Sequence, residues 1–232
     1  MLFKLSNSYV NMPSTPTRTA DQFLADIENN QAVLGFVGSS RVGKTTRSRE
    51  MAAHCQGKHI EFDDLIEQEH GMHSLVERMV GDRPDLTALQ KMGLVLQTPF
   101  ENEHYALHQQ AFLEDEANAL DKQAAVLQQD RAENICLDFT GSAPYVMDAL
   151  QEITNQDGVI AVYLEASPSH LDHIVEGFIQ HPSPICWGEL ASEMYGLDKE
   201  SHLRSFMERL LAIRHELYVD CLLYTSDAAD ER

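Results

Sequence analysis

Short apolar runs alternate with amphipathic stretches along most of the chain. Four of the runs have the length and composition of buried β-strands: Ala32–Val37, His59–Phe62, Asn134–Leu137 and Val159–Leu164. Apolar residues at helical spacing predict helices over Ala20–Asn30, Lys44–Cys55, Ala106–Leu127, Pro144–Ile153 and Leu203–Leu217, and others beginning at Asp63–Gly71 and after Ser167-Pro168. Strands that alternate with helices in this way predict an α/β fold of three layers with a central parallel sheet.

The chain divides into three segments of different character. We expect residues 1–31 to form a loose leader and a short helix, and residues 32–220 to form one domain. The last twelve residues, Cys221–Arg232, resemble the translation of a transposase mosaic-end adapter used in sequencing libraries. We therefore expect residues 221–232 to be a non-native tail, and the natural protein to continue past Asp220 with other residues.

The composition is strongly acidic. In 232 residues, 17 Lys and Arg stand against 37 Asp and Glu, which gives a formal net charge of −20. Such a charge repels phosphate and argues against a nucleic-acid or anionic-lipid partner. The sequence also lacks a secretory signal and an apolar stretch of about 18 residues. We expect a cytoplasmic protein with no membrane partner, whose four widely spaced cysteines are reduced thiols packed in the interior; its oligomeric state is left open.

A phosphate-binding loop follows the first predicted strand. The segment Gly38-Ser-Ser-Arg-Val-Gly43-Lys44-Thr45 fits the pattern GxxxxGK[ST] between a strand and a helix. Glycine at both ends lets the backbone curl its N–H groups inward, where they bind phosphate together with the positive end of the helix. We expect Lys44 to bridge the β- and γ-phosphoryl oxygens of ATP and Thr45 to ligate Mg²⁺. The predicted nucleotide-binding residues are Gly38, Ser39, Ser40, Arg41, Val42, Gly43, Lys44, Thr45 and Thr46.

Acidic residues near the ends of two predicted strands are candidates for the metal and for the acceptor. Asp138 directly follows the strand Asn134–Leu137, which is the position of a Walker B acid that holds Mg²⁺. Glu61 and Asp63 lie at the end of the second strand. For each of the three carboxylates the alternative is a solvated position, and for Asp63 in particular a helix cap.

Several further segments carry a family resemblance. They are Glu61-Phe-Asp63-Asp-Leu-Ile66-Glu67-Gln-Glu-His-Gly71, Leu137-Asp-Phe-Thr-Gly141-Ser-Ala143, Val162-Tyr-Leu164 followed by Ser167-Pro168, and Arg214-His-Glu-Leu217-Tyr218. With the phosphate loop, these segments resemble the shikimate kinase family over residues 32–220. The resemblance implies a P-loop kinase fold in which Asp63 contacts the hydroxyl to be phosphorylated and Glu61 lies near the metal. It also implies that Gly141 lines the acceptor site and that Arg214 binds the acceptor carboxylate, although an arginine on the protein surface is the alternative for Arg214.

The chain departs from the family pattern at two arginines. The family's acceptor arginine would fall near Phe112-Leu113, and its lid arginine would fall within His181-Pro-Ser-Pro-Ile-Cys186, but neither segment contains one. Residues 78–104 resemble an insertion. Two charge-assisted contacts are thereby lost, each worth roughly 1.5–3 kcal/mol. Either other arginines replace them, for which Arg78, Arg83, Arg131 and Arg204 are available, or the acceptor is not shikimate.

The sequence therefore predicts an ATP-dependent phosphotransferase of the shikimate kinase type. Its catalytic residues are Lys44 and Asp63, and its acceptor is a hydroxyl of a small, carboxylated metabolite bound by Asp63, Gly141 and Arg214. The predicted metal site contains Thr45, Glu61 and Asp138. Two alternatives remain open: a kinase of another metabolite or of a nucleoside, and a regulatory module that binds ATP without transferring its phosphoryl group.

Overall fold

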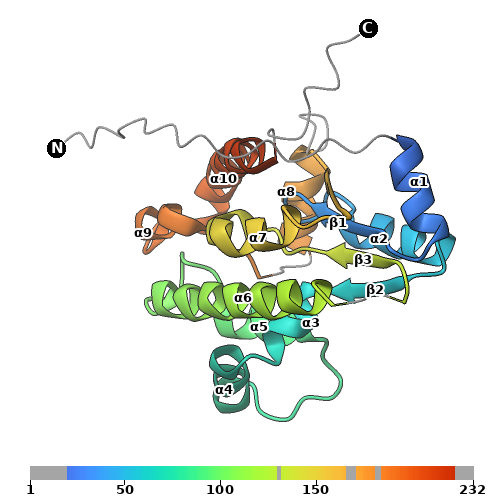
Figure 1. Cartoon of the computed structure of the whole chain (residues 1–232). Helices are drawn as coiled ribbons and strands as arrows, with labels where there is room; N and C mark the ends of the chain where they lie inside the picture. Colours follow the sequence, from blue (N-terminus) through green and yellow to red (C-terminus); the bar gives the residue numbers. More distant parts are fainter. Residues whose placement is uncertain (1–19, 130–131, 166–170, 181–183, 223–232) are drawn as a thin grey trace, which may run out of the picture.

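The computed structural model describes residues 20–129, 132–165, 171–180 and 184–222. Within them, four parallel strands form one sheet in the order β2-β3-β1-β4. The strands are β1 (Val33–Val37), β2 (Lys58–Glu61), β3 (Ile135–Asp138) and β4 (Val159–Tyr163). Each predicted strand is present with its ends within one residue of the expected position. Strand β1 pairs in parallel with β3 and β4, and β3 pairs in parallel with β2. The carboxyl ends of the strands therefore lie at the same edge of the sheet (Figure 1).

Alternate residues of the strands face two separate hydrophobic cores. Val33 and Val37 of β1 belong to the larger core, whereas Leu34 and Phe36 belong to the smaller one. This follows from the two-residue period of a strand. Because both faces of β1 are covered, this strand is apolar throughout rather than alternating, which is why it appears in the sequence as a continuous run. Strand β2, at the edge of the sheet, is polar and only partly buried.

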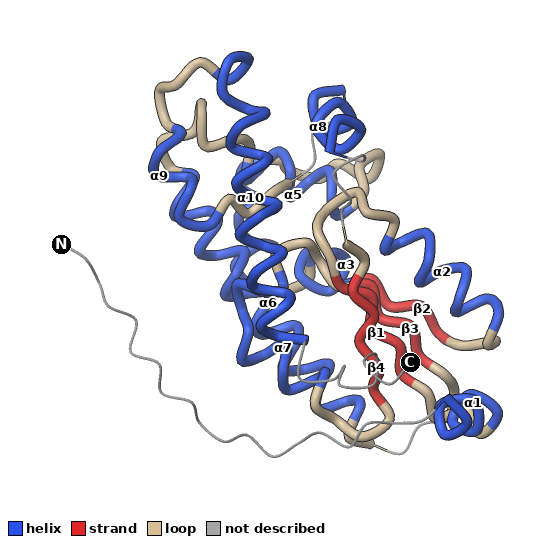
Figure 2. The backbone as a smooth tube through the Cα atoms, turned by 90° about the horizontal axis from the view of Figure 1, so that it is seen from above, coloured by secondary structure: helices blue, strands red, loops and turns tan. Residues whose placement is uncertain are grey.

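Helices α1 (Ala20–Glu28) and α2 (Lys44–His54) cover one face of the sheet, as Figure 2 shows. Phe23 and Ile27 of α1 pack against the smaller core, together with Met51 of α2. The sequence analysis separated residues 1–31 from the domain. In the structure α1 lies against the sheet, where Phe23 and Ile27 are partly buried. Residues 1–19, the predicted leader, lie outside the described residues.

The larger core lies on the other face. The helices that contribute to it are α3 (Phe62–Glu67), α4 (His70–Met79), α5 (Ala88–Leu96), α6 (Tyr105–Leu127), α7 (Met147–Thr154), α8 (Leu171–Gln180), α9 (Ala191–Met194) and α10 (Lys199–Leu222). The predicted apolar stripe of α6 is buried here at Leu120 and Leu127. The predicted α/β fold of three layers with a central parallel sheet is therefore confirmed.

Three helix boundaries differ from the sequence predictions. The segment that begins at Asp63 contains two helices, α3 and α4, and the backbone N–H groups of Gly71 and Met72 at the start of α4 donate to the carboxylate of Asp115 on α6. A 3₁₀-helix, η1 (Ala143–Val146), with Pro144 near its start, replaces the first turn of the helix predicted over Pro144–Ile153. Helix α10 continues through the first two residues of the predicted tail, Cys221 and Leu222. The rest of the predicted tail, residues 223–232, and the predicted helix start at Ser167-Pro168 lie outside the described residues.

Asn134 is a buried polar residue that connects the strands to the outer layer. Its side-chain Nδ2 donates to the carbonyl oxygens of Ile27 at 2.9 Å and of Cys55 at 3.2 Å, and its Oδ1 accepts from the Ala32 N–H at 3.0 Å. The side chain is 1% exposed. It therefore joins the ends of α1 and α2 to the start of β1 through hydrogen bonds that water does not replace.

Two other predictions concern the interior and the surface. The cysteines whose side chains the structure describes, Cys55, Cys136 and Cys186, are buried and form no disulfide, as expected. Of the helices within the described ranges, none combines the length and the apolar composition needed to cross a bilayer.

Candidate functional site

The predicted phosphate loop connects the end of β1 to the start of α2, in the strand–loop–helix context that the motif requires. Gly38 and Gly43 have φ angles of 144° and 92°, and Gly43 directly precedes the first residue of α2. A side chain at Gly38 would also collide with the Leu164 carbonyl oxygen. Both glycines are therefore required by the shape of the loop.

Lys44 lies inside this loop and is 7% exposed. Its Nζ donates to the carbonyl oxygen of Ser39 at 3.0 Å. Burial lowers the pKa of Lys44, whereas the nearby carboxylates of Asp138 and Asp63 oppose this shift. The ammonium group is thus placed between the loop backbone and two acidic side chains. Thr46, by contrast, is exposed on the first turn of α2.

Thr45 and Asp138 are in contact, as the predicted Mg²⁺ site requires. The Thr45 hydroxyl donates a hydrogen bond to the Asp138 carboxylate, and this bond and Lys44 oppose the rise in the Asp138 pKa that burial causes. Asp138 is the last residue of β3, which lies beside β1 in the sheet. The pairing of two strands distant in sequence therefore brings the loop's hydroxyl to the strand-end acid.

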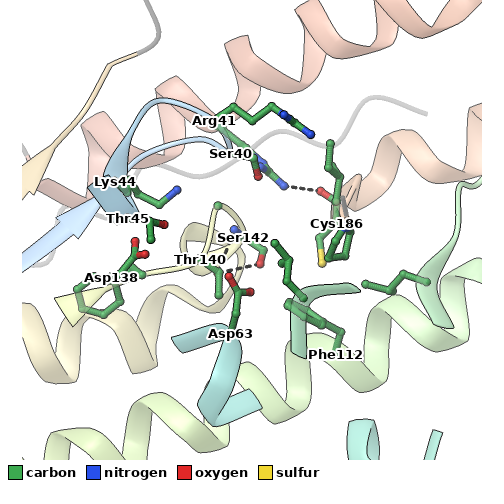
Figure 3. A pocket seen from close by; sticks show the side chains of 17 residues that line it. Ser40, Arg41, Lys44, Thr45, Asp63, Phe112, Asp138, Thr140, Ser142 and Cys186 are labelled. Carbon is green, nitrogen blue, oxygen red and sulfur yellow. Dashed lines mark hydrogen bonds between the residues drawn. The ribbon is translucent and has the colours of Figure 1, made fainter. Parts of the chain in front are cut away.

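A cavity of about 310 Å³ opens beside the loop (Figure 3). Its polar side contains Lys44 and Asp63, which point into it in Figure 3. Its apolar side includes Phe112. The complete lining is Ser40, Arg41, Lys44, Thr45, Asp63, Leu89, Leu96, Phe112, Asp138, Phe139, Thr140, Gly141, Ser142, Pro184, Ile185, Cys186 and Arg214. The predicted catalytic and acceptor-binding residues Lys44, Asp63, Gly141 and Arg214 all line this one cavity, at the edge of the sheet where ligands bind in open parallel sheets.

Asp63 reaches the cavity from the first turn of α3. Burial raises the pKa of its carboxyl group to about 7; the positive charge of Lys44 opposes the rise, and the negative charge of Asp138 adds to it. Of the two positions considered for Asp63, a solvated helix cap and the acceptor site, the structure shows a buried carboxyl group that lines the cavity, and its role toward an acceptor stays a prediction.

Glu61 takes a different position from the other predicted metal residues. It does not line the cavity; its carboxylate accepts hydrogen bonds from the Arg49 guanidinium and lies 3.5 Å from His59 Nδ1. Over the described part of the chain, no three His, Cys, Asp or Glu side chains are grouped as a metal site. The structure thus brings Thr45 and Asp138 together and directs Glu61 toward Arg49.

Arg214 is buried rather than on the surface, with 1% of its area exposed. Its Nη2 donates to the Cys186 carbonyl oxygen at 2.7 Å, and its guanidinium carbon lies 5.6 Å from the ring centre of Tyr145. Its Nε has no hydrogen-bond partner among the described residues. A guanidinium on the cavity wall is suited to an anionic ligand group, because it offers charged, paired donors.

Gly141 allows Arg214 and the phosphate loop to approach each other. A Cβ atom at this position would lie 2.8 Å from Ser40 Oγ and 2.9 Å from Arg214 Nη1. Any other residue would push these groups apart. Gly141 therefore lines the cavity between Ser40 of the phosphate loop and Arg214.

Tyr218 connects α10 to the same junction. Its hydroxyl lies 3.1 Å from the carbonyl oxygen of Gly38 and 3.4 Å and 3.3 Å from those of Thr140 and Gly141. The side chain has no exposed area. One buried hydroxyl thus holds the start of the phosphate loop against the turn that follows β3.

Glu116 is a buried acid beside the cavity that the sequence analysis did not select. It is 1% exposed, and its carboxyl group accepts hydrogen bonds from the hydroxyls of Thr140 and Ser142, while Oε2 has no partner among the described residues. Burial raises the pKa of Glu116 to about 7, although these hydrogen bonds oppose the rise. One sequence signal was present: Glu116 falls on the apolar face of α6, between Leu113 and Leu120, where a charged residue is unusual.

The arginines proposed as replacements lie elsewhere. Arg83 is paired with Asp85 and Arg204 with Asp172, both on the surface; Arg78 is exposed, and Arg131 lies outside the described residues. Phe112 itself lines the cavity near the position where the family arginine was expected. Of the segment His181–Cys186, the described residues Pro184, Ile185 and Cys186 line the cavity.

Three comparisons relate the chain to known proteins. No protein-family model matches it, and no curated protein matches it either. Among solved structures, a shikimate kinase from Acinetobacter baumannii in complex with shikimate is similar, with a TM-score of 0.48 and 17% sequence identity. The match covers 86% of this chain and 84% of that chain.

Proposed function

We propose that the protein is an ATP-dependent phosphotransferase that transfers the γ-phosphoryl group to a hydroxyl of a small, carboxylated metabolite, as shikimate kinases do. The observation that carries this proposal is that Lys44, Asp63 and Arg214 line one cavity. A phosphate-binding cation, a carboxylate and a buried guanidinium are the groups needed by the phosphoryl donor, the acceptor hydroxyl and the acceptor carboxylate.

Residues of the phosphate loop hold the donor. The loop backbone from Gly38 to Gly43 binds phosphate oxygens, and Lys44 exchanges its bond to the Ser39 carbonyl for the β- and γ-phosphoryl oxygens. Thr45 and Asp138 fit a Mg²⁺ ion, because a hydroxyl and a carboxylate in contact are the oxygen donors that such an ion uses beside phosphate. Mg²⁺ bound there neutralises charge on the phosphate oxygens.

Asp63 and Arg214 act on the acceptor. The oxygen of the acceptor hydroxyl forms a bond to the γ-phosphorus, and the bond from that phosphorus to the bridging oxygen of ADP breaks. As this happens, Asp63 accepts the proton of the hydroxyl. Its pKa of about 7 is suited to proton transfer at neutral pH. Arg214 binds the acceptor carboxylate through its guanidinium group on the cavity wall, and this orients the hydroxyl toward Lys44.

The apolar side of the cavity favours an acceptor other than shikimate itself. Leu89 and Leu96 of α5 face the cavity together with Phe112 and Ile185, and such a surface does not hydrogen-bond a ring with several hydroxyl groups. This observation supports the second candidate, a kinase of another carboxylated metabolite with fewer hydroxyls.

A coupled assay for ADP release tests the function. The panel contains shikimate, monohydroxylated cyclohexane carboxylates, sugars and nucleosides, and each carboxylate is compared with its methylamide. We expect a carboxylate to stimulate ADP release more than its methylamide, and Lys44→Ala to reduce the stimulated rate at least about 100-fold, because a cation on the transferred group is lost.

Nucleotide binding separates the alternatives. If calorimetry shows Mg²⁺-dependent binding of ATP but none of the panel stimulates ADP release, the regulatory module is favoured. If a nucleoside is phosphorylated and no carboxylate is, the acceptor class proposed here is wrong. Absence of Mg²⁺-dependent nucleotide binding would overturn phosphotransfer altogether.

A further inference from the structure

Arg41 has an unusual backbone conformation for its residue type. It lies inside the phosphate loop with a φ of 67°, in the left-handed region that an L side chain rarely adopts. Glycine would take this conformation freely, and it occupies both ends of the same loop. An arginine in a strained position is a reason to examine what its side chain does.

Arg41 contributes to the wall of the cavity, and its guanidinium group lies beside α8. Arg41 is among the lining residues and is still open to solvent, and Figure 3 shows its side chain extending from the loop above Lys44 toward the side where Cys186 lies. Its Nη1 and Cζ atoms lie 3.0 Å and 3.6 Å from the place that a Cβ atom of Gly177 would occupy. The group therefore lies against α8 at a point where the helix has no side chain.

Cations are few on the cavity wall. Among its lining residues, Arg41, Lys44 and Arg214 are the basic side chains, and Asp63 and Asp138 are the acidic ones. Lys44 and Arg214 are buried and donate to the carbonyl oxygens of Ser39 and Cys186. Arg41, by contrast, is exposed, and it belongs to the phosphate loop.

We propose that Arg41 binds the oxygens of the transferred phosphoryl group and stabilises the negative charge that they carry in the transition state, and that Gly177 provides the space in which its guanidinium rests. This inference rests on the proposed phosphotransfer function. Arginines contributed to phosphoryl-transfer sites act in this way, and a guanidinium offers paired donors to phosphate oxygens. Here the arginine comes from the phosphate loop itself.

Calorimetry with a transition-state analogue tests the proposal without an acceptor. The ligands are Mg²⁺–ADP alone and Mg²⁺–ADP with aluminium fluoride, which mimics the transferred group. The main variant is Arg41→Gly, because glycine adopts the observed φ and preserves the loop. We expect its affinity for ADP to stay within about threefold of the original protein, and its affinity for the aluminium fluoride complex to fall by roughly 100-fold or more.

Two further variants complete the design. Arg47→Ala removes the same charge from an exposed ion pair with Glu50 outside the cavity, so it controls for the strongly acidic background, and both of its affinities should stay within about threefold. Gly177→Ala should weaken binding of the aluminium fluoride complex, because the added methyl group displaces the guanidinium. The affinity for ADP should not change. The unfolding midpoint should stay the same or rise, because alanine favours the helix.

The outcomes separate this inference from the function. Equal weakening of both complexes by Arg41→Gly would show that the arginine binds the nucleotide in its ground state, and no weakening would show that it has no role; either result overturns the proposal. If Gly177→Ala leaves the affinity for the aluminium fluoride complex unchanged, the role proposed for Gly177 of α8 is wrong. If the unmodified protein binds no Mg²⁺–ADP, the phosphotransfer function itself fails.

Discussion

Asp63 and Glu116 are carboxyl groups beside one cavity whose pKa values are both raised to about 7 by burial. Their surroundings differ in what else they provide. Asp63 lies near the ammonium group of Lys44 and lines the cavity, whereas Glu116 accepts hydrogen bonds from Thr140 and Ser142. At the scale of the residue, one carboxylate thus faces the cavity and the other holds a turn.

Replacing Asp63 tests its proposed role in accepting a proton. Asp63→Asn keeps the shape of the side chain but removes its capacity to accept a proton at neutral pH. We expect turnover of an acceptor identified by the panel to fall by roughly 100-fold or more, while the affinity for Mg²⁺–ADP changes less than about threefold. Steady-state kinetics and calorimetry measure the two quantities.

The neighbouring acid provides the control for that experiment. Asp64 is exposed on the same helix, so Asp64→Asn removes an equal charge without altering the cavity wall. Its turnover should remain within about threefold. An equal loss of turnover and of nucleotide affinity in Asp63→Asn would contradict a role in accepting the hydroxyl proton.

Residues of the phosphate loop could be identified from sequence because their chemistry depends on neighbours in the chain. The positions of Lys44 and Thr45 are fixed by the glycines and the helix start a few residues away. Arg214 and Glu116 differ, since their burial depends on what packs against α10 and α6 from distant parts of the chain. For Arg214 the sequence left a surface position open, and Glu116 was not found.

At the scale of the element, a hydroxyl of α10 connects two segments beside the site. Tyr218 of α10 reaches carbonyl oxygens of both the phosphate loop and the turn after β3. Tyr218→Phe removes this donor and keeps the ring. We expect the free energy of unfolding, measured by denaturant titration, to fall by about 1–3 kcal/mol, because buried carbonyls lose their partner.

Tyr163 supplies the matched comparison. Its hydroxyl lies 3.1 Å from His215 Nδ1 in an exposed position, and its ring packs on that of Tyr218. Tyr163→Phe should change the free energy of unfolding by less than about 0.5 kcal/mol, because water replaces the lost bond. If both variants lose the same stability, the hydroxyl of Tyr218 does not connect the two segments.

Most elements were predictable because their apolar periodicity is local. The strands and the long helix α6 were found with ends within one or two residues of their observed positions. The division between α3 and α4 was not predicted. The carboxylate that caps α4 comes from Asp115 on α6, which is 43 residues away in sequence from Met72 at the start of α4. Likewise, α1 was assigned to a separate segment, since nothing in its own sequence shows that Phe23 packs on the sheet.

At the scale of the whole molecule, buried acids couple stability to pH. The pKa of Glu116 is about 7 in the folded protein and 4.5 for an unperturbed glutamate. Between these values the folded state keeps the proton and the unfolded state loses it, so the free energy of unfolding falls as pH rises. We expect Glu116 to contribute a decrease on the order of 3 kcal/mol between pH 4.5 and 8.

Denaturant titrations at pH 5 and pH 8 measure this decrease. Glu116→Gln should reduce the difference in the free energy of unfolding between the two pH values, because the group no longer titrates. Glu114→Gln, an exposed position on the same helix, removes the same charge and should leave the difference nearly unchanged. Equal effects of the two substitutions would assign the pH dependence to general repulsion in a chain of net charge −20.

The sequence by itself determined the α/β fold class, the strands and the phosphate loop, because periodicity and a short motif act over a few neighbouring residues. Only the tertiary structure decided that Arg214 is buried, that Thr45 meets Asp138, that Glu61 turns toward Arg49, and that the Arg41 guanidinium lies beside Gly177 of α8. Those outcomes depend on strand order and on which helices pack together, so they arise from contacts between segments that are far apart in the chain.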